Sequence, residues 1–236
     1  MKNKFVKQIQ ETLKDSYSAI AGEFDQTRKV PWGEFNHFLA YTKHGGHTLD
    51  VGCGNGRFYE FLKPKKVDYW GVDHNSNLLD HAQKNYPEAK FDLQDMMNLE
   101  LPRDSFDNIF CIAAYHHVPG KKMRKQVSND FHDLLKPDGV LILTVWNLFQ
   151  KKYFKNIMHA IGRCILHLGF RYQWNDLWVK WGTYPIKRYY HAFLTKELLS
   201  YFPDSKWQLE EFYFTRKGKR VSFWRSYNLV LIVRKK

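Results

Sequence analysis

The sequence predicts an α/β fold in which a mostly parallel sheet carries helices on both faces. Two observations lead to this prediction. Short apolar runs alternate with helical segments between residues 47 and 146, which is the rhythm of a parallel sheet. The first of these runs ends in a glycine-rich turn, Gly52-Cys53-Gly54-Asn55-Gly56, of the kind that joins a strand to a ligand-binding helix.

Composition narrows the class of protein further. The chain has 236 residues, enough for one domain, and its 40 aromatic residues exclude intrinsic disorder over most of its length. Its three cysteines form no CxxC pair, so neither a disulfide framework nor a zinc site is expected. Because there is no signal peptide and no apolar run of about 20 residues, we expect a cytoplasmic protein that does not enter a membrane. The formal net charge of +13 suggests a polyanionic partner such as nucleic acid.

We expect a single domain over residues 1–236, built from four parts in order. Residues 1–46 form an N-terminal helical extension, because Phe5, Ile9 and Leu13 recur every four residues on one helix face. Residues 47–146 form the cofactor-binding core. The strands expected there are 47–51, 69–73, 90–93, 106–113 and 140–145, and the helices are 57–63, 77–85 and 121–136.

The second half of the chain departs from this alternation. Residues 147–191 are aromatic and basic, and at about 45 residues they are too long for a plain connection. We interpret them as a lid or substrate-binding insertion that contains a helix. Residues 192–236 follow, with a helix at 195–201 and two strands, 207–214 and 227–233, that we expect to form an antiparallel hairpin at the sheet edge.

The strongest chemical signal is the acid that stands directly before the glycines. Asp50 would repel a phosphate but suits a ligand with an ammonium group, which points to the amino-acid end of S-adenosylmethionine. In the turn itself, the predicted cofactor-binding residues are Gly52, Cys53, Gly54 and Gly56.

Two further acids follow the next two strands. Asp73 lies 19 residues after Gly54, at the distance where an acid accepts hydrogen bonds from ribose hydroxyls. Asp95 follows the third strand and is placed to accept a proton from the adenine amino group. Their neighbours His74 and Met96 complete the predicted cofactor set. The alternative for each acid is a helix cap or a turn residue.

These motifs resemble a known family. The string Asp50-Val51-Gly52-Cys53-Gly54-Asn55-Gly56-Arg57-Phe58 resembles motif I of the class I S-adenosylmethionine-dependent methyltransferases, and the order of elements over residues 47–146 fits them. The resemblance implies a Rossmann-like sheet of seven strands whose last strand is antiparallel. It also implies that the methyl acceptor approaches past the ends of the fourth and fifth strands.

Outside the core, the chain resembles the methyltransferases that esterify 5-carboxymethyluridine at the tRNA wobble position, either alone or fused to an AlkB-type hydroxylase. The similar blocks lie at residues 17–32, 115–117, 145–146 and 188–191. The chain departs from the family where Asn-Leu-Phe-Gln follows Trp146 in place of Glu-Gln, and where Tyr115 replaces an aliphatic residue. The resemblance implies tRNA as a partner, and it makes a small zinc-binding activator protein a candidate partner.

Methylation of a carboxylate needs orientation more than acid–base chemistry, because a carboxyl group with a pKa near 4 is already ionised at neutral pH. An arginine can hold such an oxygen pair with its planar fork. The resemblance implies the following site residues, each of which could instead be structural. The catalytic candidates are Arg28, Arg188, His116 and Tyr17, and the substrate-binding candidates are Trp32, His117, Trp146, Tyr189 and Tyr190.

Three functions remain open at this point. The first is methylation of a carboxymethyl group on a wobble uridine. The second is O- or N-methylation of a small molecule under an aromatic lid. The third is a non-catalytic RNA-binding or activator subunit. The basic residues of 151–187 and of the turn 216–220 could follow an RNA backbone or simply form a solvated face.

Overall fold

The computed structural model describes residues 2–27, 33–166, 173–180, 182, 184 and 186–236. The α-helices are α1 (Lys2–Thr27), α2 (Phe35–Phe38), α3 (Arg57–Leu62), α4 (Ser76–Asn85), α5 (Lys121–Leu134), α6 (Phe154–Leu166) and α7 (Thr195–Ser200). The strands are β1 (His47–Val51), β2 (Asp68–Asp73), β3 (Lys90–Leu93), β4 (Phe106–Ile112), β5 (Leu135–Trp146), β6 (Asp176–Lys180), β7 (Lys187–His191), β8 (Trp207–Arg216), β9 (Lys219–Arg220) and β10 (Asn228–Lys235). A 3₁₀ turn, η3 (Tyr115–His117), follows β4, and another, η5 (Phe223–Arg225), precedes β10.

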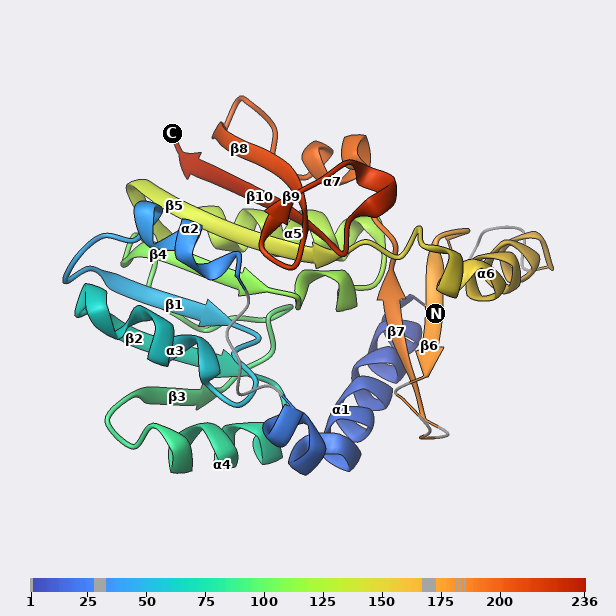
Figure 1. Ribbon diagram of the computed structural model, residues 1–236, viewed down its shortest axis with the longest axis horizontal. Coiled ribbons are helices and arrows are strands. Elements are labelled where there is room, and N and C mark those ends of the chain that lie inside the picture. Colours follow the sequence, from blue (N-terminus) through green and yellow to red (C-terminus); the bar gives the residue numbers. More distant parts are fainter. Residues whose placement is uncertain (1, 28–32, 167–172, 181, 183, 185) are drawn as a thin grey trace.

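The predicted α/β class is confirmed, with helices on both sides of a large sheet (Figure 1). Among the described residues the sheet order is β3-β2-β1-β4-β5-β10-β8-β9. The first five strands run parallel to one another, and β10 lies antiparallel between β5 and β8.

Two details of the prediction are wrong. The sheet has eight strands instead of seven, because the chain turns back after β8 and the two-residue β9 pairs with its end. The last two long strands, β8 and β10, pair antiparallel as predicted, but β9 and not this pair forms the edge of the sheet. β10 is an interior strand that pairs with β5 on one side and β8 on the other. Its fully apolar centre, Leu229 to Val233, is buried because apolar clusters cover both faces of the sheet there.

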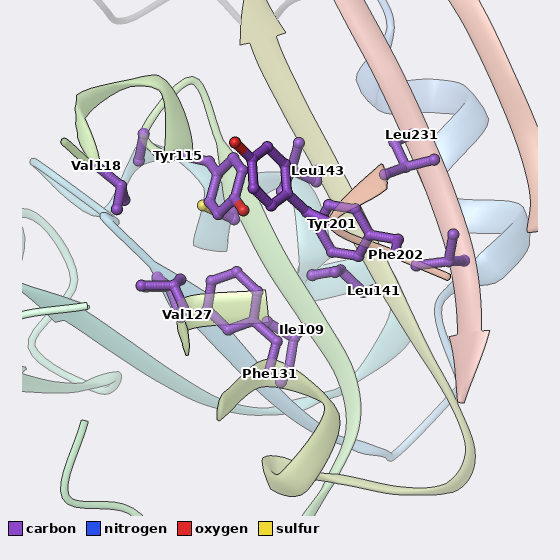
Figure 2. Close-up of a cluster of buried hydrophobic side chains, with 14 of the residues drawn as sticks. Ile109, Tyr115, Val118, Val127, Phe131, Leu141, Leu143, Tyr201, Phe202 and Leu231 are labelled. Atoms are coloured by element: carbon purple, nitrogen blue, oxygen red, sulfur yellow. The ribbon is translucent and has the colours of Figure 1, made fainter. Parts of the chain in front are cut away.

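A single apolar cluster holds the sheet against α5 and the segment after α7 (Figure 2). Tyr115 lies within it, fully buried, with its ring stacked on Phe193 at 5.6 Å and its hydroxyl donating to the Arg124 carbonyl at 2.8 Å. Burial of a side chain of this size contributes roughly 1.5–3 kcal/mol. Tyr115 therefore anchors η3, and with it the two histidines that follow.

The carboxyl ends of the parallel strands all point toward α1 and the β6–β7 hairpin (Figure 1). Helix α1 buries one face, with Ile9, Leu13 and Ile20 at helical spacing. The side chain of Asn75, at the start of α4, donates to the Lys14 carbonyl at 2.9 Å and so ties α1 to the sheet. Helix α1 consequently borders the edge of the sheet where a ligand of an open α/β fold binds.

The predicted insertion contains the expected helix, α6, and a two-stranded sheet formed by β6 and β7. The hairpin lies between α6 and α1, because Leu177 and Val179 pack in the cluster with α6 while Tyr189 packs on Ile9 of α1. No helix in the described part of the chain is long and apolar enough to cross a membrane. The same residues contain no cluster of three or more metal-ligating side chains.

Candidate active site

The glycine turn after β1 has a backbone that other residues would strain. Gly52 has φ +76°, and a Cβ atom there would lie 2.5 Å from the Cβ of Ala114. Gly56 has φ +74°, and a Cβ atom there would lie 2.8 Å from the ring of Phe91. These glycines thus let the backbone turn tightly and leave its inner face open to a ligand.

Asp50 lies at the end of β1 and is buried. Its Oδ2 accepts a hydrogen bond from the Tyr69 hydroxyl at 2.8 Å. Burial raises the pKa of this carboxyl to about 7; the Tyr69 hydrogen bond opposes the rise, and the nearby Asp73 adds to it. A buried carboxylate without a cation beside it is costly, so a bound ammonium group would be strongly stabilised here.

Asp73, at the end of β2, fixes the local backbone. Its Oδ2 accepts from the Gly54 amide and its Oδ1 from the Asn75 amide, each at 2.9 Å. A carboxylate has about four acceptor positions, so the side chain keeps capacity for ribose hydroxyls. The neighbouring His74 has a buried Nε2 without a hydrogen-bond partner among the described residues. Burial opposes protonation of His74, but Asp73 raises its pKa.

Asp95 and Met96 lie at the end of β3. Asp95 accepts from the Met97 amide at 2.9 Å and from the side-chain amide of Gln10, which comes from α1. Met96 lines the same cavity as Asp73 and His74. The end of β3 is therefore closed by α1.

One pocket brings Asp50, Asp73, His74 and Met96 together, while Asp95 lines a smaller pocket that shares Asp73, His74 and Met96 with it. The cofactor side of the larger pocket is formed by the strand ends, and its other side by α1, η3, the end of β5 and β7. The sequence-predicted residues that line it are Tyr17, Asp50, Gly52, Cys53, Gly54, Asp73, His74, Met96, His117, Trp146 and Arg188.

Arg188 forms the centre of the side opposite the glycine turn. Its guanidinium carbon lies 5.0 Å from the ring centre of Tyr17, 5.2 Å from that of Tyr190 and 6.0 Å from that of Trp146. Tyr190 and Trp146 stack on each other, 5.2 Å apart. A buried cation held by aromatic faces is pre-oriented to receive an anion from the pocket.

Tyr17 and His117 form a hydrogen-bonded pair beside Arg188. The Nδ1 of His117 lies 2.7 Å from the Tyr189 carbonyl, and a carbonyl can only accept, so Nδ1 carries the proton. The Tyr17 hydroxyl therefore donates to Nε2 at 2.8 Å. Burial and the charge of Arg188 lower the pKa of His117 to about 3, so the ring is neutral at physiological pH.

His116 is fully buried beside the aromatic rings that surround Arg188. Its Nδ1 accepts from the Trp146 amide at 3.2 Å, which leaves the proton on Nε2. Burial, with His117 and Arg188 nearby, lowers its pKa well below the usual value. His116 does not line the pocket, so it contacts residues that form the pocket, such as Trp146, and not the pocket itself.

Tyr189 also lies away from the pocket. Successive side chains of a strand point to opposite faces, so Arg188 and Tyr190 share one face of β7 while Tyr189 and His191 share the other. The Tyr189 hydroxyl donates to Asp176 Oδ1 at 2.6 Å, and His191 Nδ1 lies 2.7 Å from the same oxygen. Two predicted residues, Arg28 and Trp32, lie outside the residues that the structure describes.

Several residues of the site were not predicted from the sequence. Arg124, fully buried in α5, donates to the Tyr201 hydroxyl at 3.1 Å and the Val118 carbonyl at 3.0 Å. It lies 3.8 Å from Glu197, whose Oε1 is 2.8 Å from His191. Burial opposes ionisation of Glu197, but His191 lowers its pKa. This buried network fixes β7 to the main sheet.

Ala113, at the end of β4, is a second residue missed by sequence reasoning. It has φ +54°, which is strained for a residue with a Cβ atom, and its amide donates to the Thr144 carbonyl at 3.0 Å. It lines the pocket between the two sides of the site. An alanine gives no sequence signal of such a conformation.

The strand order with an antiparallel β10, the glycine turn after β1 and the acids at successive strand ends define the class I methyltransferase fold. A family model described as "Methyltransferase domain" matches residues 48–139. A Methanosarcina mazei structure described as an S-adenosylmethionine-dependent methyltransferase is similar, with a TM-score of 0.70, 22% identity, and coverage of 84% of this chain and 96% of that one.

A protein of Encephalitozoon cuniculi named as a methyltransferase is 31% identical over 190 residues, which cover 80% of this chain and 83% of that protein. The chain therefore belongs to the methyltransferase family.

Curated relatives with a named substrate are also similar. The tRNA (carboxymethyluridine(34)-5-O)-methyltransferase of Xenopus tropicalis is 32% identical over 140 residues, or 59% of this chain and 22% of that protein. The protein of the same name from Saccharomyces cerevisiae is 30% identical over 148 residues, or 63% of this chain. The chain spans about half the length of the yeast protein (52%) and about a fifth of the frog protein.

Proposed function

We propose that this chain is an S-adenosylmethionine-dependent methyltransferase that esterifies the carboxymethyl group of a modified wobble uridine in tRNA. The observation that carries this proposal is the buried guanidinium of Arg188, which faces the same pocket as the acids of the glycine turn. The named activity of the relatives from frog, yeast and Arabidopsis thaliana supports the choice of acceptor.

The cofactor side fits S-adenosylmethionine. Asp50 would pair with its ammonium group, which would stabilise the ionised form of a carboxyl whose pKa burial raises to about 7. Asp73 would accept from the ribose, and the unpartnered Nε2 of His74 lies at the same pocket. Gly52, Cys53, Gly54 and Gly56 would border the amino-acid end, while Asp95 and Met96 would border the adenine.

When bound, the cofactor supplies an electrophilic methyl group on a positively charged sulfur. The chain has to hold an ionised carboxylate in line with that methyl group, about 3 Å away, without quenching it. Arg188 provides a fork that orients both oxygens. Tyr17 and His117 would form the wall of the acceptor side. The Tyr17 hydroxyl already donates to His117 Nε2, and His117 Nδ1 already donates to the Tyr189 carbonyl.

Neutral histidines agree with this chemistry. The pKa values of His116 and His117 both lie below the ordinary range, so neither ring competes with Arg188 for the acceptor charge. Trp146 lines the pocket and would stack on the uracil ring, as in the recognition of single-stranded RNA, while the fully buried Tyr190 stacks on Trp146 and would support it. Arg28 and Trp32 keep their proposed roles at the acceptor on the resemblance alone.

The deciding experiment uses radiolabelled S-adenosylmethionine and bulk tRNA from cells that lack the activity. We expect label in a wobble nucleoside that mild alkali removes, because an ester is cleaved and a methyl group on nitrogen or carbon is not. Label that survives alkali, or turnover that survives RNase treatment of a cell extract, would favour the small-molecule enzyme. Cofactor binding with no transfer to any tRNA would favour the non-catalytic subunit.

The same assay addresses partners and compartment. We propose that tRNA is the macromolecular partner and that the protein acts in the cytoplasm. The purified chain should be assayed alone and with a small zinc-binding activator protein, and transfer that needs the second protein would make that protein a required partner.

A further inference from the structure

Two grooves lead away from the acceptor pocket over the surface of the molecule. The first shares Trp146 with the pocket, and the second, between α6 and the β6–β7 hairpin, shares Lys152 and Tyr153 with the first. The first groove is lined by Gly33, Glu34, Trp146, Asn147, Gln150, Lys152, Tyr153, Lys217, Tyr227 and Asn228. The two grooves therefore form one path over the surface, which adjoins the pocket at Trp146.

This path is positively charged. In the second groove the lining residues include Lys155, Lys180 and Lys187 and no carboxylate. Among the described residues, no carboxylate forms a salt bridge with these three lysines or with Lys152, whereas Lys43 and Lys136 of the main domain body pair with Asp107 and Lys63 pairs with Glu60. The lysines of the path thus present charge that the protein itself does not neutralise.

The one acid of the path faces inward. Glu34 is buried, and its Oε1 accepts from the Thr215 hydroxyl at 2.5 Å. The path also carries exposed rings beside cations. Tyr227 is 37% exposed, with the guanidinium of Arg216 at 4.8 Å and the ammonium of Lys152 at 6.0 Å from its ring centre. Rings that alternate with cations are the surface that binds single-stranded nucleic acid.

We propose that the two grooves bind the nucleotides on either side of the target nucleotide, with Tyr227 as a stacking platform and Lys152 at the junction. This inference rests on the proposed function, because the target nucleotide is taken to occupy the pocket between Arg188 and the glycine turn. It adds to that function the route of the RNA strand and the residues that hold it.

Binding of an unmodified anticodon stem-loop RNA, measured by fluorescence anisotropy on the full chain, tests the proposal without turnover. Tyr227→Ala should weaken binding roughly 5- to 150-fold through the loss of one stacked base. Tyr227→Phe keeps the ring and should bind within about twofold of the unaltered protein. Unchanged affinity for adenosylhomocysteine shows that each variant is folded.

The charges are tested by salt dependence. Removal of one lysine that binds a phosphate should flatten the plot of log affinity against log salt by about 0.7, so Lys152→Ala/Lys180→Ala should flatten it by about 1.4. The matched control is Lys66→Ala/Lys84→Ala, which removes two exposed lysines that line neither groove. The proposal is overturned if the control pair weakens binding as much as the groove pair, or if Tyr227→Ala binds RNA like the unaltered protein.

The outcome separates this inference from the proposed function. If the protein forms the ester on tRNA normally but none of the groove variants changes RNA binding, the proposed role of the grooves is refuted and the proposed function is not. Groove-dependent RNA binding without methyl transfer would refute the function alone. Groove-dependent binding to vesicles of anionic phospholipid, with no binding to the stem-loop, would assign the path to a membrane surface and refute the RNA route.

Discussion

The buried carboxyl of Asp50 should make cofactor affinity depend on pH. With its pKa at about 7, about nine-tenths of the ligand-free protein carries a protonated Asp50 at pH 6, against about one-tenth at pH 8. If only the ionised form receives the ammonium group, affinity for adenosylhomocysteine should be about tenfold weaker at pH 6 than at pH 8. Asp50→Asn should bind weakly and with no such dependence.

Calorimetric titration at both values of pH provides the test. His74 has a raised pKa and lies at the same pocket, so His74→Gln serves as the control and should keep the tenfold change. Equal affinities at pH 6 and pH 8, or Asp50→Asn binding as tightly as the unaltered protein, would refute the argument.

The stability of the ligand-free protein should change with pH in the direction opposite to its affinity for adenosylhomocysteine. A pKa raised from 3.8 to about 7 means that the ligand-free native state binds more protons than the unfolded state between these values, so the free energy of unfolding falls as pH rises through them. At 1.36 kcal/mol per unit the effect is about 4 kcal/mol. Asp50→Asn should therefore stabilise the ligand-free protein against urea at pH 8 and change little at pH 4. Loss of stability at pH 8 would contradict the buried charge.

Three further predictions concern single residues. Arg188→Ala should abolish methyl transfer while adenosylhomocysteine binds within about twofold, and Arg188→Lys should restore little because the fork is lost; a variant that cannot bind the cofactor would contradict the assignment. Gly52→Ala should cost roughly 1–3 kcal/mol in urea unfolding through its contact with Ala114 and its positive φ. Arg124→Met should cost roughly 1–3 kcal/mol by leaving the Val118 carbonyl and the Tyr201 hydroxyl without their buried donor, and a smaller loss would mean that the network contributes little.

The strand ends and their acids could be predicted from the sequence because their signals are local. An apolar run, an acid and a glycine turn lie within a few residues of one another at Asp50, and an apolar run also leads directly to Asp73. These segments fold as predicted because their burial on both faces and their turn chemistry require the same arrangement.

The parts that could not be predicted depend on contacts between distant segments. Tyr189 and Tyr190 are indistinguishable in sequence, and only the pairing of β7 with β6 decides which of them shares a face of the strand with Arg188. Arg124 lies in a basic helix where an exposed charge is the ordinary expectation, and its partners come from other elements. The two residues of β9 are too few to carry a strand pattern.

Side chains alternate between the two faces of β7, and the two faces have different functions that depend on the same strand register. One row of side chains faces the reacting group and the other fastens the hairpin to the body of the protein, so a shift of one position would exchange them. Such a shift would place the guanidinium of Arg188 beside the carboxylates that bind the other face of β7. It would also turn the phenol of Tyr189 toward the methyl donor. Insertions or deletions inside this short ribbon should therefore be severely damaging.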